Sequence, residues 1–195
     1  MAFRCSRAPR RFGESVVFTF ALIALLSSGC ATPQVPGAVG HDLPAFHQVD
    51  DGLYRGGQPS PEGIKQLAQR GIQTVISLRQ PSKTTAWERR LAEQLGMRWV
   101  SLPMWFWWRP SDRQVRQFLA IAADPASRPV FVHCRQGWNR AGILVAAYRV
   151  VHNGWTPTQA YREARQYGLV PWNLASRYLI FYEAPREFAE STAPP

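Results

Sequence analysis

The sequence predicts an α/β fold in which a mainly parallel central sheet carries helices on both faces. Segments typical of buried strands alternate with segments typical of helices from residue 53 onward, and this alternation implies parallel strands joined by right-handed crossovers. The chain has 195 residues, of which 46% are hydrophobic, so it can bury one sizeable core. One folded domain is therefore expected.

Hydrophobic patterning and turn residues place the individual elements. Short apolar or β-branched runs indicate strands, and helices are expected to start at capping residues and to end at glycine or Asn-Gly. The expected strands are residues 53–55, 72–78, 99–102 and 129–132, and the expected helices are residues 61–70, 85–95, 112–123, 141–151, 157–167 and 173–188.

Three helix starts carry side chains suited to capping. Ser60 precedes a proline at the first helical position, which is a common N-terminal arrangement. Ser111 and Gln114 have capping-box spacing, and so do Thr85 and Glu88. We therefore expect Glu88 to act as a capping residue at the start of the second helix.

The first 29 residues are typical of a signal peptide. Four arginines precede an apolar run over residues 16–26, which is too short to span a bilayer comfortably, so cleavage is expected. The small residues before Cys30 resemble a bacterial lipobox, although Ser27 stands where leucine is commoner. We expect an exported, periplasmic lipoprotein that is anchored to the membrane by diacylation of Cys30.

Residues 30–40 are small and rich in proline and glycine, as expected of a flexible linker after a lipid anchor. The folded domain is expected over residues 41–190 and a short tail over 191–195. Cys5 leaves with the signal peptide and Cys30 is lipidated, so Cys134 is the one cysteine of the exported domain and no disulfide framework is expected.

The formal net charge of +10 comes almost entirely from arginine, because Lys65 and Lys83 are the only lysines. Removal of the signal peptide, with its four arginines and one glutamate, leaves +7. The arginines are scattered and form no basic stripe interleaved with aromatic residues. We expect a monomer that does not bind nucleic acid. A generally arginine-rich composition is the favoured explanation of the charge, ahead of a functional one.

The run from His133 to Arg140 carries the strongest functional signal. Cys134 directly follows the apolar strand 129–132, and Arg140 lies where the buried helix begins. A loop between such a strand and helix can direct backbone N–H groups inward to bind an anion, and Gly137 eases the backbone angles that this requires. The loop residues expected to contact phosphate are Arg135, Gln136, Gly137, Trp138, Asn139 and Arg140.

Each residue of this run has an expected role. The Arg140 guanidinium can bind two phosphate oxygens at once, and the same positive field favours a thiolate nucleophile at Cys134. His133 is expected to position the cysteine. A cysteine alone at a strand end is more often a small buried hydrophobe, but the pattern His-Cys-x-x-Gly-x-x-Arg arises by chance in only about one chain of this length in several thousand.

These residues resemble the signature His-Cys-x5-Arg of the protein tyrosine and dual-specificity phosphatase superfamily. The similarity extends to residues 54–60, 71–79 and 129–142, as in the small bacterial dual-specificity-like branch, and covers roughly residues 48–185. The resemblance implies the compact cysteine-phosphatase fold and a phosphocysteine intermediate at Cys134. It also implies that no metal and no cofactor is needed.

Two positions depart from the family pattern. Ala141 stands where serine or threonine usually helps the thiolate leave. Its lack of a hydroxyl predicts slow hydrolysis of the phosphocysteine intermediate. The loop after residue 102 lacks the usual aspartate, and the nearest acid is Asp112. We name Asp112 as the candidate general acid, although a carboxylate at a helix start is also favoured by the helix dipole alone.

Several neighbouring residues leave their roles open. The aromatic run 105–108 can line a substrate mouth, touch a membrane surface or pack beneath the loop, and packing is the default expectation. Arg79 and Arg55 either reach a second phosphate or form structural ion pairs, with ion pairs favoured. Trp138 either shapes access to the pocket or packs away from it.

Three functions are compatible with this run of residues. The leading hypothesis is a phosphatase that hydrolyses phosphate monoesters, either on protein side chains or on a small polyphosphorylated compound such as an inositol phosphate. The second is a binding module that holds a phosphorylated ligand without turnover. The third is a sulfurtransferase of the rhodanese kind, which the His-Cys start and the loop length disfavour.

Overall fold

The computed structural model describes residues 40–171. The expected signal peptide (1–29), the lipidation site Cys30, the linker up to residue 39, the helix over 173–188 and the tail over 191–195 lie outside the described residues. Between residues 40 and 171, no helix is both long and apolar enough to cross a membrane.

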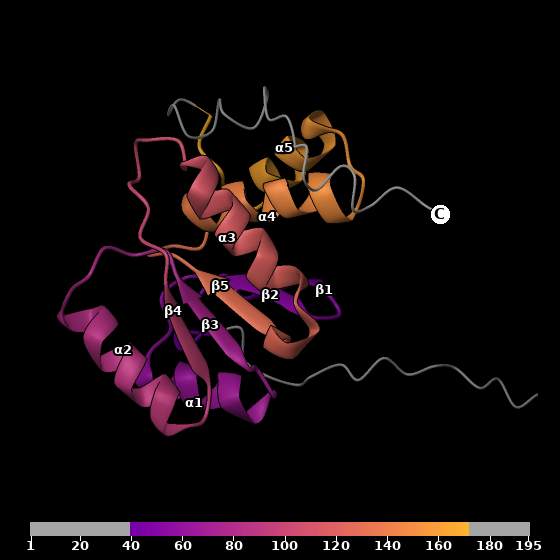
Figure 1. The fold of residues 1–195 in the computed structure, drawn as a ribbon. Coiled ribbons are helices and arrows are strands. Elements are labelled where there is room, and N and C mark those ends of the chain that lie inside the picture. Colours follow the sequence, from indigo (N-terminus) through magenta and orange to yellow (C-terminus); the bar gives the residue numbers. More distant parts are fainter. Residues whose placement is uncertain (1–39, 172–195) are drawn as a thin grey trace, which may run out of the picture. The chain divides into compact units, whose positions relative to one another are not determined.

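A five-stranded sheet lies at the centre of the domain, with the strand order β1-β2-β5-β3-β4 (Figure 1). β1 pairs with β2 in antiparallel fashion, and the other neighbours are parallel. The carboxyl ends of the four parallel strands therefore meet at one edge of the sheet, where ligands bind in such folds. The strands are β1 (His47–Asp50), β2 (Leu53–Gly56), β3 (Thr74–Ser77), β4 (Arg98–Ser101) and β5 (Val130–His133).

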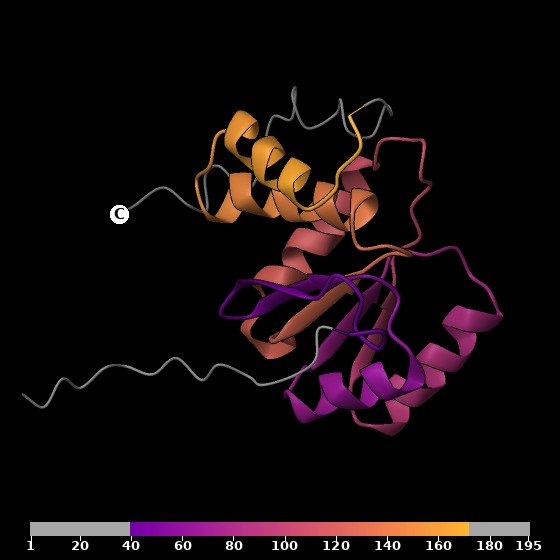
Figure 2. The same ribbon diagram turned by 180° about the vertical axis from the view of Figure 1, so that it is seen from behind.

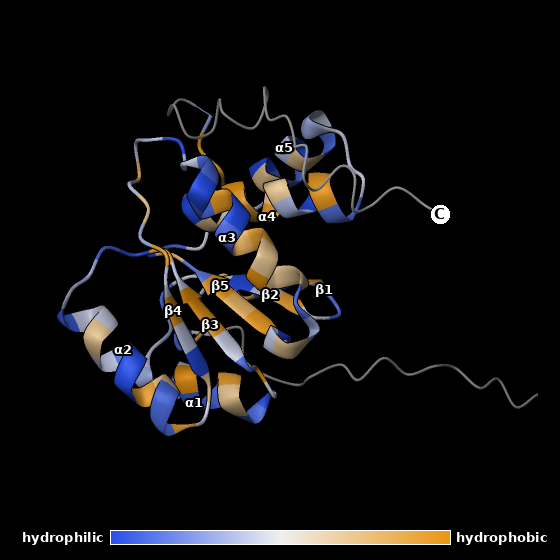
Figure 3. Cartoon of the chain, viewed as in Figure 1, coloured by the Kyte–Doolittle hydropathy of each residue, from blue (hydrophilic) through white to orange (hydrophobic). Residues whose placement is uncertain are grey.

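Helices cover both faces of this sheet (Figures 1 and 2). One face carries α1 and α2, and the opposite face carries α3, α4 and α5. Each face has its own hydrophobic core, and the central strands β3 and β5 supply apolar side chains to both (Figure 3). The helices are α1 (Pro61–Gln69), α2 (Lys83–Gln94), α3 (Asp112–Ala123), α4 (Asn139–His152) and α5 (Pro157–Gln166), with a short 3-10 helix η1 (Pro125–Ser127) before β5.

The predicted fold class is confirmed, and most of the predicted elements are present. The side chain of Ser60 accepts a hydrogen bond from the backbone of Gly63 and caps α1. Ser111 and Gln114 form the expected capping box of α3. The sequence did not indicate β1, because this edge strand is short and mostly polar and so lacks the apolar signal of a buried strand.

The prediction that Glu88 caps the second helix is wrong. The helix begins two residues earlier than expected, with Ser82 as its N-cap and Thr85 completing the capping box. Glu88 lies one turn further along α2 and is completely buried. Its carboxylate is thereby available for a different contact, beneath the loop that carries Cys134.

Candidate active site

The loop from Cys134 to Trp138 connects the end of β5 to the start of α4, as the sequence predicts. α4 is buried along nearly its whole length, so it fixes the far end of the loop firmly in the core. Gly137 has a φ of 82°, and a Cβ at this position would lie 2.6 Å from the backbone carbon of Gly56. Only glycine fits both the backbone conformation and the space.

Residues 56–58 lie alongside this loop and hold it through backbone hydrogen bonds. The amide of Cys134 donates to the carbonyl of Gly56 at 3.4 Å, and the amide of Gln58 donates to the carbonyl of Arg135 at 3.1 Å. The first of these residues ends β2, which pairs directly with β5. The segment resembling the phosphatase family near residue 54 therefore supports the catalytic loop.

Cys134 is 2% exposed and lies at the beginning of the loop. The backbone N–H of Gly137 points at its sulfur, with a distance of 3.2 Å between Gly137 N and Cys134 Sγ. An N–H directed at sulfur can stabilise negative charge there, as nucleophilic chemistry requires. The direction of this N–H is the one required of the anion-binding loop that the sequence predicts.

Arg140 lies in the first turn of α4 and reaches across the carboxyl edge of the sheet. Its Nη1 donates to the carbonyls of Leu78 and Met104, at 3.2 and 3.3 Å. Leu78 directly follows β3, and Met104 lies in the segment after β4. Two neighbouring strands therefore orient the guanidinium, whose Nη2 carries further N–H donors.

Arg55 is almost completely buried and also supports the loop. Its Nη2 donates to the carbonyl of Gly137 at 2.7 Å and to that of Trp138 at 3.4 Å, and its guanidinium carbon lies 4.8 Å from the centre of the Tyr167 ring. Burial lowers the pKa of Arg55, although the nearby Cys134, among other groups, acts to raise it. The expected ion pair is replaced by contacts with loop carbonyls.

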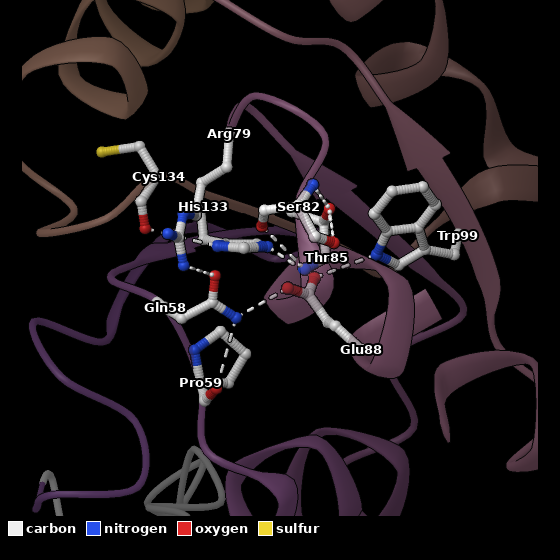
Figure 4. A network of polar contacts seen from close by, with 9 residues as sticks. All are labelled: Gln58, Pro59, Arg79, Ser82, Thr85, Glu88, Trp99, His133 and Cys134. Atoms are coloured by element: carbon white, nitrogen blue, oxygen red, sulfur yellow. Dashed lines mark hydrogen bonds and ion pairs between the residues drawn. The ribbon is translucent and has the colours of Figure 1, made fainter. Parts of the chain in front are cut away.

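A network of polar contacts centred on Glu88 lies on the side of the His133 ring that faces away from Cys134 (Figure 4). One carboxylate oxygen of Glu88 lies 2.7 Å from His133 Nε2 and accepts a hydrogen bond from Trp99 Nε1 at 2.9 Å. The other oxygen accepts a hydrogen bond from Gln58 Nε2 at 2.6 Å. Arg79 Nη1 donates to the Gln58 side-chain oxygen at 2.8 Å and so fixes the orientation of this amide.

These contacts keep Glu88 ionised inside the protein. Burial acts to raise the pKa of Glu88, but the electrostatic interaction with His133 and the hydrogen bonds with His133, Gln58 and Trp99 outweigh it, so the pKa is lowered. The opposite ring nitrogen of His133 lies 3.3 Å from the carbonyl oxygen of Cys134. Glu88 therefore orients the histidine that precedes Cys134, and Arg79 acts on this network through Gln58.

Sequence reasoning missed Glu88, Gln58 and Trp99 as parts of the site. The signal available for Glu88 was its place on the buried face of α2, where it lies between Thr85 and Ala92. A glutamate is almost never fully buried unless it is paired. A charged residue on an apolar helix face therefore indicated a buried partner.

The remaining loop residues divide between exposed and structural positions. Arg135, Gln136 and Trp138 are exposed, so the first two can meet a ligand from solvent. The ring of Trp138 lies against Gly168 and is 41% exposed. The Asn139 side chain accepts a hydrogen bond from the amide of Val170 at 2.8 Å, which ties α4 to the chain after α5.

The two departures from the family pattern differ in their surroundings. Ala141 is completely buried in the first turn of α4, close behind the loop. Asp112 is exposed at the first position of α3, where it also interacts favourably with the helix dipole. Its assignment as general acid stays a prediction.

The default expectation that the aromatic run 105–108 packs beneath the loop is wrong for its tryptophans. Trp105, Trp107 and Trp108 are 66%, 56% and 64% exposed, whereas Phe106 is partly buried. Phe106 and Trp107 make an edge-to-face contact with ring centres 4.7 Å apart. The preceding residue, Met104, is the one that enters the core.

Comparison with known proteins identifies the family. Residues 41–176 match the family described as "DSP-PTPase phosphatase fused to NAD+ Kinase". The chain belongs to this dual-specificity phosphatase family. The match covers the described domain, with its cysteine loop and supporting segments, and confirms the resemblance drawn from the sequence.

Individual relatives agree with this family assignment. The dual-specificity protein phosphatase TpbA of Pseudomonas aeruginosa is 30% identical over 63% of this chain, and the inositol diphosphatase DSP3 of Arabidopsis thaliana is 28% identical over 71% of it, which is 68% of that protein. The crystal structure of TpbA covers 84% of this chain and 99% of its own, with 26% identity and a TM-score of 0.65. TpbA is also known in complex with pTyr.

The chain spans only part of several of these relatives. It covers 54% of TpbA and 11% of the chloroplast NAD kinase 2 of Arabidopsis thaliana, to which it is 28% identical over 53% of its own length. The family assignment therefore concerns the phosphatase domain that the described residues form.

Replacing Glu88 with glutamine tests the network beneath the loop. Because Arg79 fixes the Gln58 amide, the new side-chain amide would face donors that it cannot bind, and we expect a loss of about 1–3 kcal/mol in the free energy of unfolding. Urea denaturation at neutral pH measures this loss. The difference should shrink in acid, because a carboxylate with a lowered pKa contributes stability above its usual pKa and loses it as the pH falls through the lowered value.

Two variants serve as controls for this measurement. Glu93→Gln changes an exposed carboxylate on the same helix that pairs with Arg89, and should cost no more than about 0.5 kcal/mol. The double variant Gln58→Glu/Glu88→Gln moves the carboxylate one place along the network and should recover part of the loss. Equal stability of Glu88→Gln and Glu93→Gln would contradict the interpretation.

Proposed function

We propose that this protein is a phosphatase that hydrolyses phosphate monoesters through a phosphocysteine intermediate at Cys134. The observation that carries the proposal is the loop itself, in which the Gly137 N–H points at the Cys134 sulfur and Arg140 is anchored at the same edge of the sheet. Family membership favours this activity over the binding-module and sulfurtransferase alternatives.

The proposed reaction has two steps. The Cys134 thiolate attacks phosphorus, the S–P bond forms, and the ester P–O bond breaks as Asp112 gives a proton to the leaving oxygen. Loop N–H groups and Arg140 bind the phosphoryl oxygens throughout. Water then attacks phosphorus and returns a proton to Asp112, and the S–P bond breaks to release phosphate and restore the thiolate.

The substrate is a phosphate monoester, either on a protein side chain or on a small polyphosphorylated compound. Relatives support both, since TpbA is named a dual-specificity protein phosphatase and DSP3 an inositol diphosphatase. The exposed Arg135 suits either substrate, because an arginine guanidinium binds phosphate oxygens in pairs.

We also propose that the protein is exported and anchored to a membrane. The signal-like first 29 residues and the lipobox-like segment before Cys30 support export to the periplasm, cleavage and anchoring of the protein to the membrane through lipid on Cys30. The enzyme would then act at a bacterial envelope, and its partners would be its phosphorylated substrate and the membrane.

Hydrolysis of p-nitrophenyl phosphate under reducing conditions tests the activity. We expect steady, vanadate-sensitive release of phosphate that Cys134→Ser abolishes and Arg140→Ala lowers by at least about 100-fold, as loss of a transition-state donor does. Cys134→Ser removes the proposed nucleophile with little change in size. We therefore expect this variant to keep its fold, so that its loss of activity reports the loss of the thiol. A single burst followed by no turnover would instead show that phosphocysteine forms and is not hydrolysed, and would assign that defect to Ala141, where the family usually has a hydroxyl.

The pH dependence of the rate tests Asp112. If this residue protonates the leaving group, Asp112→Asn should remove the basic limb of the pH–rate profile and slow poor leaving groups most. Asp124→Asn, at the other end of α3, provides a matched control. A profile that Asp112→Asn leaves unchanged would exclude this residue from proton transfer.

Metabolic labelling with fatty acid tests the lipid anchor. Cys30→Ser removes the only side chain that the lipobox can modify, so the protein should no longer acquire lipid, and labelled fatty acid should be absent from it. Incorporation of label into the Cys30→Ser protein would contradict the assignment of Cys30.

A further inference from the structure

Residues 105–109, which we call the tryptophan loop, form an exposed aromatic surface beside the active site. Trp105, Trp107 and Trp108 each expose more than half of their surface. Soluble proteins usually limit contiguous apolar surface, and a larger exposed patch commonly marks a contact with a protein or a membrane. Three such indoles within four residues therefore indicate a surface that contacts another molecule or a membrane.

The loop begins directly at the catalytic edge of the sheet. Figures 1 and 2 show it as an extended segment between the end of β4 and the start of α3. Its base is fixed, because Met104 is buried and its carbonyl accepts a hydrogen bond from Arg140 Nη1 at 3.3 Å. A surface that contacts this loop therefore lies near Arg140 and the Cys134 loop.

The charge around the loop is positive. Arg109 in the loop and Arg113 and Arg116 on α3 are all exposed. Between Glu93 and Asp124 the sequence contains a single acidic residue, Asp112. Three exposed indoles are thus followed along the chain by three exposed arginines, in the same loop and on the first half of α3, a combination that suits a surface that is both apolar and negatively charged.

We propose that the tryptophan loop and the start of α3 dock onto the surface of an anionic phospholipid bilayer. Tryptophan prefers the headgroup region, where its ring is partly in hydrocarbon and its N–H remains hydrated. Basic residues near the surface are attracted to anionic lipid headgroups. A peptide or small ligand would instead favour a concave aromatic pocket, whereas these rings stand more than half exposed on a loop.

This contact would set the orientation of the enzyme and not merely its attachment. A lipid on Cys30 alone would attach the protein to a membrane without fixing its orientation, because the segment that follows Cys30 has the proline- and glycine-rich sequence expected of a linker. Docking of the tryptophan loop would direct the catalytic edge of the sheet toward the bilayer. The inference goes beyond the proposed phosphatase activity and does not depend on turnover.

Quenching of tryptophan fluorescence by brominated lipids tests this inference. The full chain is reconstituted with vesicles of phosphatidylcholine and phosphatidylglycerol, and any N-terminal attachment is common to all variants. We expect quenching in the unaltered chain, and a clear decrease in Trp105→Phe/Trp108→Phe, in which Trp107 is the one indole left in the loop. Trp155→Phe, which removes an indole that lies under Arg149 near α5, should retain it.

A second pair of variants tests the charges. Arg113→Gln/Arg116→Gln should lower quenching on anionic vesicles to the level seen with phosphatidylcholine alone, whereas Arg89→Gln/Arg90→Gln, two exposed arginines on α2, should not. All measurements are repeated with Cys134→Ser, so that failure of catalysis and failure of docking are separate results. Unchanged quenching in the tryptophan double variant overturns the inference. Unchanged quenching together with a raised KM for a soluble phosphopeptide in the same tryptophan double variant would show that the loop contacts the substrate and not the membrane.

Discussion

The close approach of residues 56–58 to the loop at Cys134 is the constraint on which the site depends. A strand end and a loop can lie this close only if no side chain separates them, and a Cβ at Gly137 would be 2.6 Å from the backbone of Gly56. The approach allows two backbone hydrogen bonds that hold the loop curled, and the curl directs the Gly137 N–H at sulfur. The pairing of β2 with β5 makes this arrangement part of the sheet.

Two buried charges stabilise the curled loop from different sides. Arg55 holds the carbonyls of Gly137 and Trp138, while Glu88 holds His133. Glu88 is well satisfied by three donors, but Nε and Nη1 of Arg55 make no hydrogen bond with the described residues and are compensated only in part by the Tyr167 ring. A buried, incompletely satisfied cation costs stability, so its retention next to the loop is best explained by the loop carbonyls that it orients.

The sequence predicted the local elements of the fold well, but it did not predict the contacts between residues that lie far apart along the chain. The strand before Cys134, the buried helix after it and the cap at Ser60 follow from periodicity and residue preferences over a few positions. The contacts of Glu88 with His133 and of Arg55 with Gly137 join residues 45 and 82 positions apart, which no local pattern encodes. The capping-box spacing of Glu88 was misleading for the same reason, since burial by α2 packing overrides a local preference.

Arg140 connects the chemistry to the surface around it. The same Nη1 binds the carbonyls of Leu78 and Met104, so the position of the Arg140 guanidinium depends on the base of the tryptophan loop. Movement of that base would change the geometry of the proposed phosphate binding, because a guanidinium must keep its planar donors aligned with the phosphoryl oxygens. A loop anchored in this way can contact an external surface through Trp105 and Trp108 while its buried end at Met104 keeps the Arg140 guanidinium in place.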